Sequence, residues 1–327
     1  MFGNLVNLHD VVTFAEKVRD VRWLVRRLAP VSRIRIRAAW QHTDAPATSW
    51  ADIPDLHRRW NLLITGSPDL SPEDYVVNRY FSGRTDLRML SLGCGTGEKE
   101  LAWLAGGRIS QMEAFDLSPE RIARATARAA ERGLEDRATF RVADARRLAL
   151  EPGRYDLVLL DGALHHLAPV RNVLDSVAQA ISPVGLLVLN DFVGPSRFQW
   201  TDAQLEAVRD VLVEIPATYR RRWQTGKPKS REYRPGKLSL WINDPSEAAE
   251  SSDILPGLRE RFDLLQTTPL GGTILHLLFK DIAHHYIRPD DTARRILNSA
   301  FAAEDRALAA GTLPSDFVFA VARPARR

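Results

Sequence analysis

The stretch MLSLGCGTG, residues 89–97, decides how this chain folds. Its first four residues form a short apolar run that is typical of a buried strand, and glycines follow at alternate positions. Gly93, Gly95 and Gly97 can adopt positive φ angles and let a ligand lie against bare backbone. Residues 98–105 then have helical spacing, and the start of a helix offers unpaired N–H groups. The stretch therefore predicts a strand, a turn and a helix that together bind an anionic or carboxylate-bearing ligand.

Strand and helix patterns alternate along the chain after this unit. One helix is expected to begin at Ser118, a suitable N-cap, with Pro119 in its first position and Gly133 at its end. Five apolar strands separated by helices imply a parallel sheet covered on both faces. The predicted fold is a doubly wound, Rossmann-like α/β domain, completed by two late strands to a sheet of seven. Strands are expected at 89–92, 112–115, 139–142, 157–160, 186–189, 262–265 and 317–321, and later helices at 201–214, 272–286 and 292–310.

Changes in composition divide the chain into four predicted segments. Residues 1–60 have apolar positions near a 3.6-residue period and are expected to form an N-terminal helical cap. Residues 61–195 form the α/β core. Residues 196–260 are expected to form a lid over a small-molecule pocket between the late strands, and within them residues 216–250 are polar, basic and proline-containing. Residues 261–327 complete the core.

The composition of the 327 residues is that of an ordinary globular protein, with 45% hydrophobic and 26% charged residues. This excludes a disordered or fibrous chain. No apolar run approaches the roughly 18 residues that a membrane helix needs, and the first ten residues lack a basic segment followed by an apolar one. Cys94 is the single cysteine, so no internal disulfide is expected, and no Cys/His spacing indicates a zinc site. The expected location is a reducing cytoplasm.

Basic residues gather in two places although the net charge is only +4. Arginines crowd residues 19–37, and residues 220–237 are rich in Lys and Arg with Glu232 as the one acid. Such clusters can meet phosphates or carboxylates, although a solvated arginine face also explains them. The second cluster contains aromatic residues and keeps a nucleic-acid-binding function open.

Acidic residues end the strands that follow the glycine turn. Asp116 comes 19 residues after Gly97, about where dinucleotide-binding folds place a carboxylate on ribose hydroxyls. Asp144 ends the third strand, where its carboxylate could accept a hydrogen bond from an exocyclic adenine amine. Either alone could be a solvated residue. Together, at one edge of the sheet, they favour a nucleoside ligand.

These motifs resemble those of the class I S-adenosylmethionine-dependent methyltransferases. LSLGCGTG, AFDLSP, VADARRL and YDLVLLDGALHHL look like the first four motifs of that family. The GxGxG spacing, without a second nucleotide-binding half, argues against NAD. The resemblance covers residues 60–325 and extends to a bacterial subgroup found in polysaccharide and secondary-metabolite pathways. One position departs from it, because the broad family usually has an acidic residue where Ser91 stands.

The resemblance implies S-adenosylmethionine as the cofactor. The glycines would line its methionyl part, Asp116 would bind the ribose and Asp144 the adenine. Cys94 would be a small buried spacer and not a nucleophile, because its place between glycines supplies no neighbouring base. The implied cofactor-binding residues are Ser91, Gly93, Cys94, Gly95, Gly97, Asp116, Leu117, Ala143, Asp144, Ala145 and Asp161.

Methyl transfer needs an acceptor in line with the methyl carbon, and a base only if that acceptor arrives protonated. Candidate catalytic residues therefore lie at the ends of the fourth and fifth strands. His165 and His166 are adjacent, so only one of them is expected to face the pocket, either as a base or as a hydrogen-bonding or packing residue. Asp191 could assist that histidine or cap its own loop. These three residues form the predicted catalytic group.

Substrate-binding residues are expected at the end of the fifth strand and in the 196–260 segment. Aromatic side chains there can pack a substrate or face a sulfonium, although core packing is the commoner role. The DPSEA stretch is polar and follows a proline-containing insertion, where a binding loop is expected. The pair His284 and His285 lacks a third ligand, so no metal site is predicted. The predicted substrate-binding residues are Asn190, Trp200, Tyr233, Ser246 and Glu247.

Three functions remain open on these residues. The first is methyl transfer to an oxygen or nitrogen of a small biosynthetic metabolite, which could be sugar-containing, anionic or carrier-bound. The second is cyclisation or elimination within the same cofactor, releasing methylthioadenosine. The third is an RNA-binding methyltransferase or scaffold, although no RNA-binding motif and no Asn-Pro-Pro-Tyr motif is present. We therefore expect a small-molecule substrate, with neither nucleic acid nor membrane as partner, and the sequence indicates no oligomeric state.

Overall fold

A mixed β-sheet organises the structure, which is a computed structural model describing residues 49–325. Seven strands of the described part form it, in the order β3-β2-β1-β4-β5-β7-β6. The first five pair in parallel, and β7 runs antiparallel to both β5 and β6. The predicted seven-stranded, doubly wound fold is therefore confirmed. The strands are β1 (Leu87–Leu92), β2 (Ile109–Asp116), β3 (Ala138–Val142), β4 (Tyr155–Asp161), β5 (Ile181–Phe192), β6 (Phe262–Gly271) and β7 (Phe317–Pro324).

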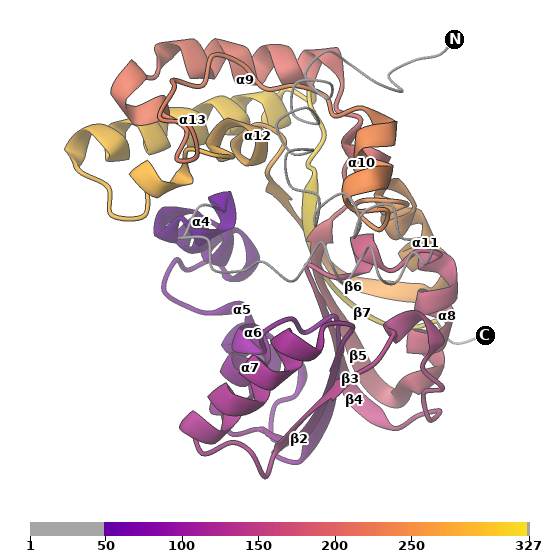
Figure 1. Cartoon of the computed structure of the whole chain (residues 1–327). Coiled ribbons are helices and arrows are strands. Elements are labelled where there is room, and N and C mark those ends of the chain that lie inside the picture. The colour runs from indigo at the N-terminus through magenta and orange to yellow at the C-terminus, as the bar shows by residue number, and fades with distance from the viewer. Residues whose placement is uncertain (1–48, 326–327) are drawn as a thin grey trace.

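Helices cover both faces of this sheet (Figure 1). Four of them belong to the core of one face, namely α4 (Pro54–Thr65), α5 (Pro72–Tyr80), α6 (Glu98–Ala105) and α7 (Pro119–Glu131). The other face is covered by α8 (Val170–Ala180) and α11 (Ile254–Arg261). Three further helices lie in the segments that follow β5 and β6, and α12 (Leu275–Phe279) packs against both α9 (Asp202–Glu214) and α13 (Asp291–Ala309) (Figure 1). A fourth helix, α10, spans Lys237–Asn243.

Alternate residues of β1 enter two separate hydrophobic cores. Met89 is buried in the core beneath α5 to α7, whereas Leu90 and Leu92 are buried in the core beneath α8 and α11. A strand that is buried on both faces has a largely apolar sequence, here interrupted only by Ser91, which is why residues 89–92 could be recognised. Replacing Leu90 with alanine should cost about 2–5 kcal/mol of folding free energy.

Helix starts follow the expected capping signals. The Ser118 hydroxyl accepts a hydrogen bond from the Arg121 N–H at 3.3 Å, and Pro119 is the first residue of α7. Thr201 caps α9 and forms a capping box with Gln204. The first cap fixes the N-terminus of α7 close to the end of β2, where the site described below is built.

The single helix predicted for residues 272–286 is wrong. The segment contains the short α12 and a separate 3₁₀ turn, with Asp281 between them at a φ of 66°. The buried ammonium of Lys229 donates to the carbonyl oxygens of Leu277 at 2.6 Å and Lys280 at 2.9 Å. The helix ends here because a distant lysine takes the carbonyl groups at its C-terminus.

A helical cap was predicted for residues 1–60. Residues 1–48 of this segment lie outside the described residues. The described remainder holds a 3₁₀ turn at Trp50–Asp52 followed by α4. Trp60 of α4 donates a hydrogen bond to the carbonyl of Leu270 at 3.2 Å, which ties this helix to β6. The boundaries of the four segments stay predictions. Among residues 49–325, every helix is too short or too polar to span a membrane.

Candidate active site

The turn after β1 has three glycines in the left-handed region of backbone space. The φ angles are 79° at Gly93, 56° at Gly95 and 74° at Gly97. A Cβ added to Gly93 would lie 2.6 Å from that of Ala163, so this turn fits against the segment after β4 only without a side chain. A Cβ on Gly97 would lie 2.9 Å from the Phe140 ring. Gly97 therefore permits close packing of α6, whereas Gly93 and Gly95 border an open cleft.

Two carboxylates stand at the strand ends beside this turn. Asp116 accepts hydrogen bonds from the N–H groups of Gly95 at 3.0 Å and Ser118 at 2.8 Å, one on each oxygen. Asp144 binds the guanidinium of Arg146 through both oxygens, each at 2.8 Å. Carboxylates of this kind accept hydrogen bonds from hydroxyl and amine donors, so both side chains are suitable partners for a ligand at this edge of the sheet.

Two open cavities meet at the glycine turn, where they share Gly93, Arg121 and Gly162. We name the first cavity the nucleoside end, after the ligand that the sequence predicts beside the strand-end carboxylates. Asp116 and Asp144 line it together with small apolar residues. The other residues around it are Phe115, Leu117, Ala143, Ala145, Arg146, Ala163, His166, Leu167 and Ser246.

The second cavity, the amino-acid end, carries side chains of both charges. Lys99 at the start of α6 forms an ion pair with Asp161 at the end of β4. Burial of Lys99 disfavours its charge, but Asp161 outweighs this effect and the pKa of Lys99 is raised. Glu100 also lines this cavity and accepts a hydrogen bond from the Ser91 hydroxyl at 2.8 Å. Its remaining charged lining residues are Glu98, Arg121, Arg124 and Arg128.

His165 and Asp191 form a buried pair beside the first cavity. His165 lies in the 3₁₀ turn Leu164–His166 after β4, and its Nδ1 is hydrogen-bonded to Asp191 of β5. Asp191 also accepts hydrogen bonds from the backbone N–H groups of Leu164 at 2.6 Å and Phe192 at 2.7 Å. Burial opposes a charged His165, but the Asp191 carboxylate prevails, so the pKa of His165 is raised.

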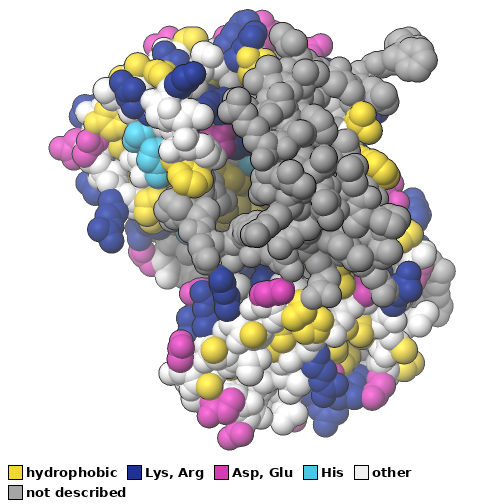
Figure 2. Space-filling model, in the orientation of Figure 1, with side chains coloured by type: hydrophobic (Ala, Val, Ile, Leu, Met, Phe, Trp, Pro, Cys, Tyr) yellow, Lys and Arg dark blue, Asp and Glu magenta, His cyan; other side chains and the backbone are white. Residues whose placement is uncertain are grey.

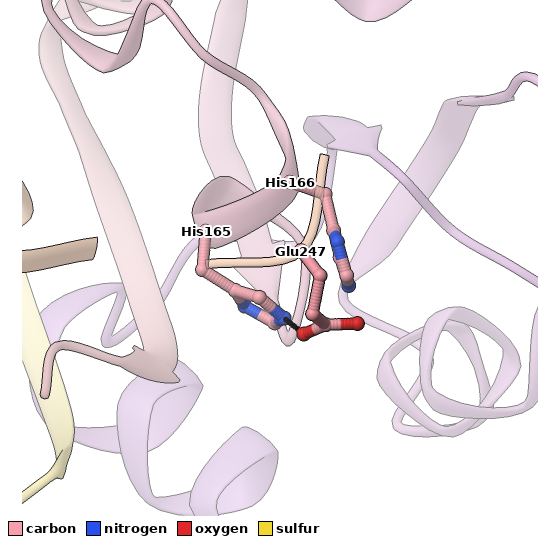
Figure 3. A group of neighbouring side chains, drawn as sticks. All are labelled: His165, His166 and Glu247. Carbon is pink, nitrogen blue, oxygen red and sulfur yellow. Dashed lines mark ion pairs between the residues drawn. The ribbon is translucent and has the colours of Figure 1, made fainter. Parts of the chain in front are cut away.

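Glu247, from the segment between β5 and β6, faces the other side of the His165 ring. Its Oε1 lies 3.7 Å from Nε2 of His165, and Figure 3 shows the two side chains pointing toward one another with His166 alongside. Burial raises the pKa of Glu247 to about 7, although His165 opposes this shift. The His165 ring thus has Asp191 at Nδ1 and Glu247 at Nε2. We name these three residues the reaction end.

His166 lines the nucleoside end. Of the two adjacent histidines, it is therefore the one that borders the predicted cofactor pocket. Its Nδ1 lies 3.4 Å from the Ser246 hydroxyl, which in turn donates to Asp244 at 2.6 Å. Burial, reinforced by His165, holds the pKa of His166 well below its ordinary value. His166 is therefore neutral at pH 7, and the pKa shifts of the two neighbouring histidines are opposite in direction.

A metal ion could be held by one group of the described residues, formed by His165, His166 and Glu247. The ligating atoms of these three side chains all lie within 4.8 Å of one another. Two imidazoles and a carboxylate are a donor set that suits zinc and similar transition metals better than magnesium. The sequence placed these residues separately and predicted no metal site.

The predicted cofactor residues divide between the cavity walls and the layer behind them. Ser91 is buried behind the turn and bonds Glu100, and Gly97 packs against α7 and β3. Burial raises the pKa of the Cys94 thiol, so it stays protonated, in keeping with a spacer and not a nucleophile. The cavities are lined by Gly93, Cys94, Gly95, Asp116, Leu117, Ala143, Asp144, Ala145 and Asp161.

The predicted substrate residues are dispersed more widely. Ser246 and Glu247 meet the histidine pair, and Asn190 donates to Asp161 at 3.3 Å. Trp200 is buried in an aromatic cluster, and Tyr233 contacts Arg231. Of the predicted group, Ser246 and Glu247 are therefore the residues that the structure brings to His165 and His166.

Glu100 and Lys99 were missed by sequence reasoning. A signal for Glu100 was present, because it stands four residues before Leu104, on the face by which α6 enters the core. An acid on a core-facing helical position needs a buried partner, and that partner is Ser91.

A comparison with protein families identifies the part of the chain that contains these features. Residues 89–185 match the family described as a methyltransferase domain. This chain contains a class I S-adenosylmethionine-dependent methyltransferase domain. S-Adenosylmethionine is the cofactor of that class, and the methyltransferase domain spans the glycine turn, both strand-end carboxylates and the histidine pair.

Related enzymes match parts of the chain. The 27-O-demethylrifamycin SV methyltransferase of Amycolatopsis mediterranei is 30% identical over 124 residues, which are 38% of this chain and 45% of that protein. The erythromycin 3''-O-methyltransferase of Saccharopolyspora erythraea is 25% identical over 190 residues, 57% of this chain and 59% of that protein. The chain thus spans about half the length of these relatives. A geranyl diphosphate C-methyltransferase structure from Streptomyces coelicolor is 14% identical, with 91% and 99% coverage and a TM-score of 0.49.

The two cavities fit the parts of this cofactor. A nucleoside offers hydroxyl and amine donors, and the nucleoside end has the Asp116 and Asp144 carboxylates to accept them. A methionyl group carries one positive and one negative charge, and the amino-acid end provides Glu100 and Asp161 as well as Lys99. The methyltransferase domain therefore has suitable residues for both ends of S-adenosylmethionine.

Proposed function

We propose that this protein transfers a methyl group from S-adenosylmethionine to a hydroxyl oxygen of a small biosynthetic metabolite, with His165 as the base. The observation that carries the proposal is the buried His165–Asp191 pair, whose imidazole ring centroid lies 3.9 Å from that of His166 in the wall of the first cavity. When bound, the cofactor supplies an electrophilic methyl carbon, whose bond to sulfur breaks as the bond to the acceptor oxygen forms.

The His165 ring is held in the tautomer that a base requires. Asp191 accepts the Nδ1–H, so the lone pair of neutral His165 resides on Nε2. The acceptor hydroxyl would bind at Nε2 and lose its proton there. The imidazolium that forms is stabilised by Asp191 on one side and by Glu247 on the other, at 3.7 Å.

Two considerations favour oxygen over nitrogen as the acceptor atom. A hydroxyl needs its proton removed during transfer, whereas a neutral amine attacks through its own lone pair. The names of the two relatives described above also record O-methylation. A secondary metabolite or a sugar-containing compound is the acceptor class that we propose.

An aromatic cluster next to the reaction end suits an acceptor with apolar surface. The Phe192 ring centroid lies 6.2 Å from that of His165 and 5.0 Å from that of Phe198. Phe198 stacks on Trp200 at 5.1 Å. His276 joins this cluster, and burial lowers its pKa to about 3, so the cluster stays uncharged. We propose that these rings form one wall of the acceptor site.

Three basic residues of the 220–237 segment, namely Arg222, Lys229 and Arg234, pair with acids of the same chain. Arg222 pairs with Asp281, and Arg234 pairs with Asp202 at 2.6 Å. On the face drawn in Figure 2, Lys and Arg side chains are interspersed with Asp and Glu. Nucleic-acid binding relies on unneutralised positive charge, so these pairs support a small-molecule acceptor.

The test is to incubate the purified protein with S-adenosylmethionine, with and without a metabolite extract of its host, and to identify every adenosine product by mass spectrometry. We expect S-adenosylhomocysteine to form only when extract is present, together with a metabolite heavier by one methylene unit. Methylthioadenosine as the main product would contradict methyl transfer and indicate cyclisation or elimination.

A further inference from the structure

Glu100 is a buried acid that the proposed reaction does not use. Its exposed fraction is only 4%, and it stands on the first turn of α6, directly after the glycine turn. Glutamate is almost never this buried unless something compensates its charge. Its Oε1 accepts the hydrogen bond from Ser91, a neutral hydroxyl that is itself buried at the end of β1.

Lys99, the basic residue next to Glu100 in the chain, forms an ion pair with a different acid. Lys99 precedes Glu100 in α6 and forms its ion pair with Asp161, so it favours the Glu100 carboxylate only from a distance. Burial, as the main cause, raises the pKa of Glu100 to about 7, while the Ser91 hydroxyl opposes the shift. Among residues 49–325, the carboxyl group is therefore held by a hydrogen bond, and no ion pair compensates its charge.

The position of Glu100 indicates what could supply that compensation. It lines the amino-acid end of the cleft, which it shares with Gly93, Gly95 and Asp161. A ligand that occupies both cavities brings its amino-acid part to this end, because the nucleoside end holds the strand-end carboxylates. The α-ammonium is the cationic group of that part, and a carboxylate accepts charge-assisted hydrogen bonds from it.

We propose that Glu100 binds the α-ammonium group of the cofactor and that Ser91 positions the Glu100 carboxylate for this contact. The helix thus supplies an acid that β1 lacks at Ser91, and the strand supplies the hydroxyl that orients it. The Glu100–Ser91 contact couples the first turn of α6 to the end of β1, on either side of the glycine turn. The proposal concerns cofactor binding and holds whether or not the acceptor is an alcohol.

The experiment compares two ligands that differ only in the amino group. Affinities for S-adenosylhomocysteine and for its deaminated analogue are measured by titration calorimetry on the full chain, as wild type and as Glu100→Gln. The wild type should prefer the aminated ligand by about 10- to 100-fold, the range of a hydrogen bond between charged groups. Glu100→Gln should reduce this preference to about threefold or less.

Glu131→Gln is the control. Glu131 is the exposed last residue of α7 and lines neither of the two cavities. This variant should keep the preference of the wild type. Ser91→Ala, which leaves the carboxylate but removes its orienting hydroxyl, should show an intermediate preference.

The preference is a ratio of two affinities on one protein sample, so partial misfolding of a variant does not change it. If Glu100→Gln yields no folded protein, Glu100→Asp takes its place and should lower the preference severalfold because its carboxylate is withdrawn. A Glu100→Gln protein that keeps the full preference, or that loses affinity equally for both ligands, would overturn the proposal. Loss of methyl transfer alone would bear on His165 and not on this contact.

Discussion

The nucleoside end and the reaction end of the cleft both depend on carboxylates, but they are built in different ways. Asp144 is held by Arg146, two residues further along the chain, and Asp116 by the N–H groups of its own turn and the glycine turn. At the reaction end, Asp191 and Glu247 reach His165 from other segments of the chain. Binding of the cofactor is thus encoded locally, whereas the proton chemistry depends on tertiary assembly.

The nucleoside end and the reaction end also differ in the pKa values of their side chains. At the reaction end the pKa of His165 is raised by its carboxylate neighbours, and burial raises the pKa of Glu247 to about 7. Groups that titrate near neutrality suit proton transfer, whereas groups fully bonded to backbone or arginine suit binding. Mutations at the two ends should therefore separate turnover from affinity.

The largest effect is expected from His165→Gln. Loss of the base should lower kcat by about 10²- to 10⁴-fold, while the affinity for S-adenosylhomocysteine stays within about twofold. Steady-state kinetics and titration calorimetry measure the two quantities. His284→Gln, in the 3₁₀ turn at Ala283–His285, is the control and should leave both unchanged. Full activity of His165→Gln from pH 6 to 9 would show that positioning alone drives the reaction.

Asp191→Asn should lower kcat by about 10²-fold and shift the pH profile. The base works when deprotonated, so activity rises with pH through the pKa of His165, which Asp191 raises. Removing the carboxylate lowers that pKa and should move the rising limb to lower pH. An unchanged limb would mean that another group titrates. The variant should also lose about 1–3 kcal/mol of stability, because Leu164 and Phe192 donate to this carboxylate.

Zinc should inhibit methyl transfer by occupying the group formed by His165, His166 and Glu247. The metal would take the Nε2 lone pair that the reaction needs, and chelation with EDTA should restore the rate. Glu247→Gln, which removes the one anionic ligand, should raise the half-inhibitory zinc concentration about tenfold. Inactivation by EDTA in the absence of added zinc would contradict this account and make a metal part of the reaction.

Asp116→Asn should have the smallest effect of the four and act on affinity alone. The amide oxygen can still accept from Gly95 or Ser118, but one strong acceptor for the ribose is lost. Calorimetry should show about a 5- to 20-fold weaker affinity for S-adenosylhomocysteine, with kcat at saturating cofactor nearly unchanged. A large fall in kcat would erase the distinction between the two ends.

The local origin of the nucleoside end explains why it could be predicted. The glycine turn, Asp116 and Asp144 all follow directly from apolar strands, and strand ends in a parallel sheet share one edge. His165 and Asp191 were recognised for the same reason, since they follow β4 and end β5. Each was found from its own strand, without any long-range contact.

Features that depend on distant segments were beyond sequence reasoning. Glu247 was expected to touch substrate, but its approach to His165 is set by the path of the insertion after β5. The break of the expected helix at residues 272–286 depends on Lys229, which donates to carbonyls of that segment from about 50 positions away. The position of Glu100 on the core-facing side of α6 indicated burial, but its partner Ser91 on β1 is set by packing between the two elements.

A crystal structure of the complex with S-adenosylhomocysteine tests the central claim most directly. The account predicts the adenosine between Asp116 and Asp144, the ammonium on Glu100 and the sulfur facing the space beside Nε2 of His165. A nucleoside bound elsewhere, or a sulfur turned away from the His165–Glu247 side of the cleft, would contradict it.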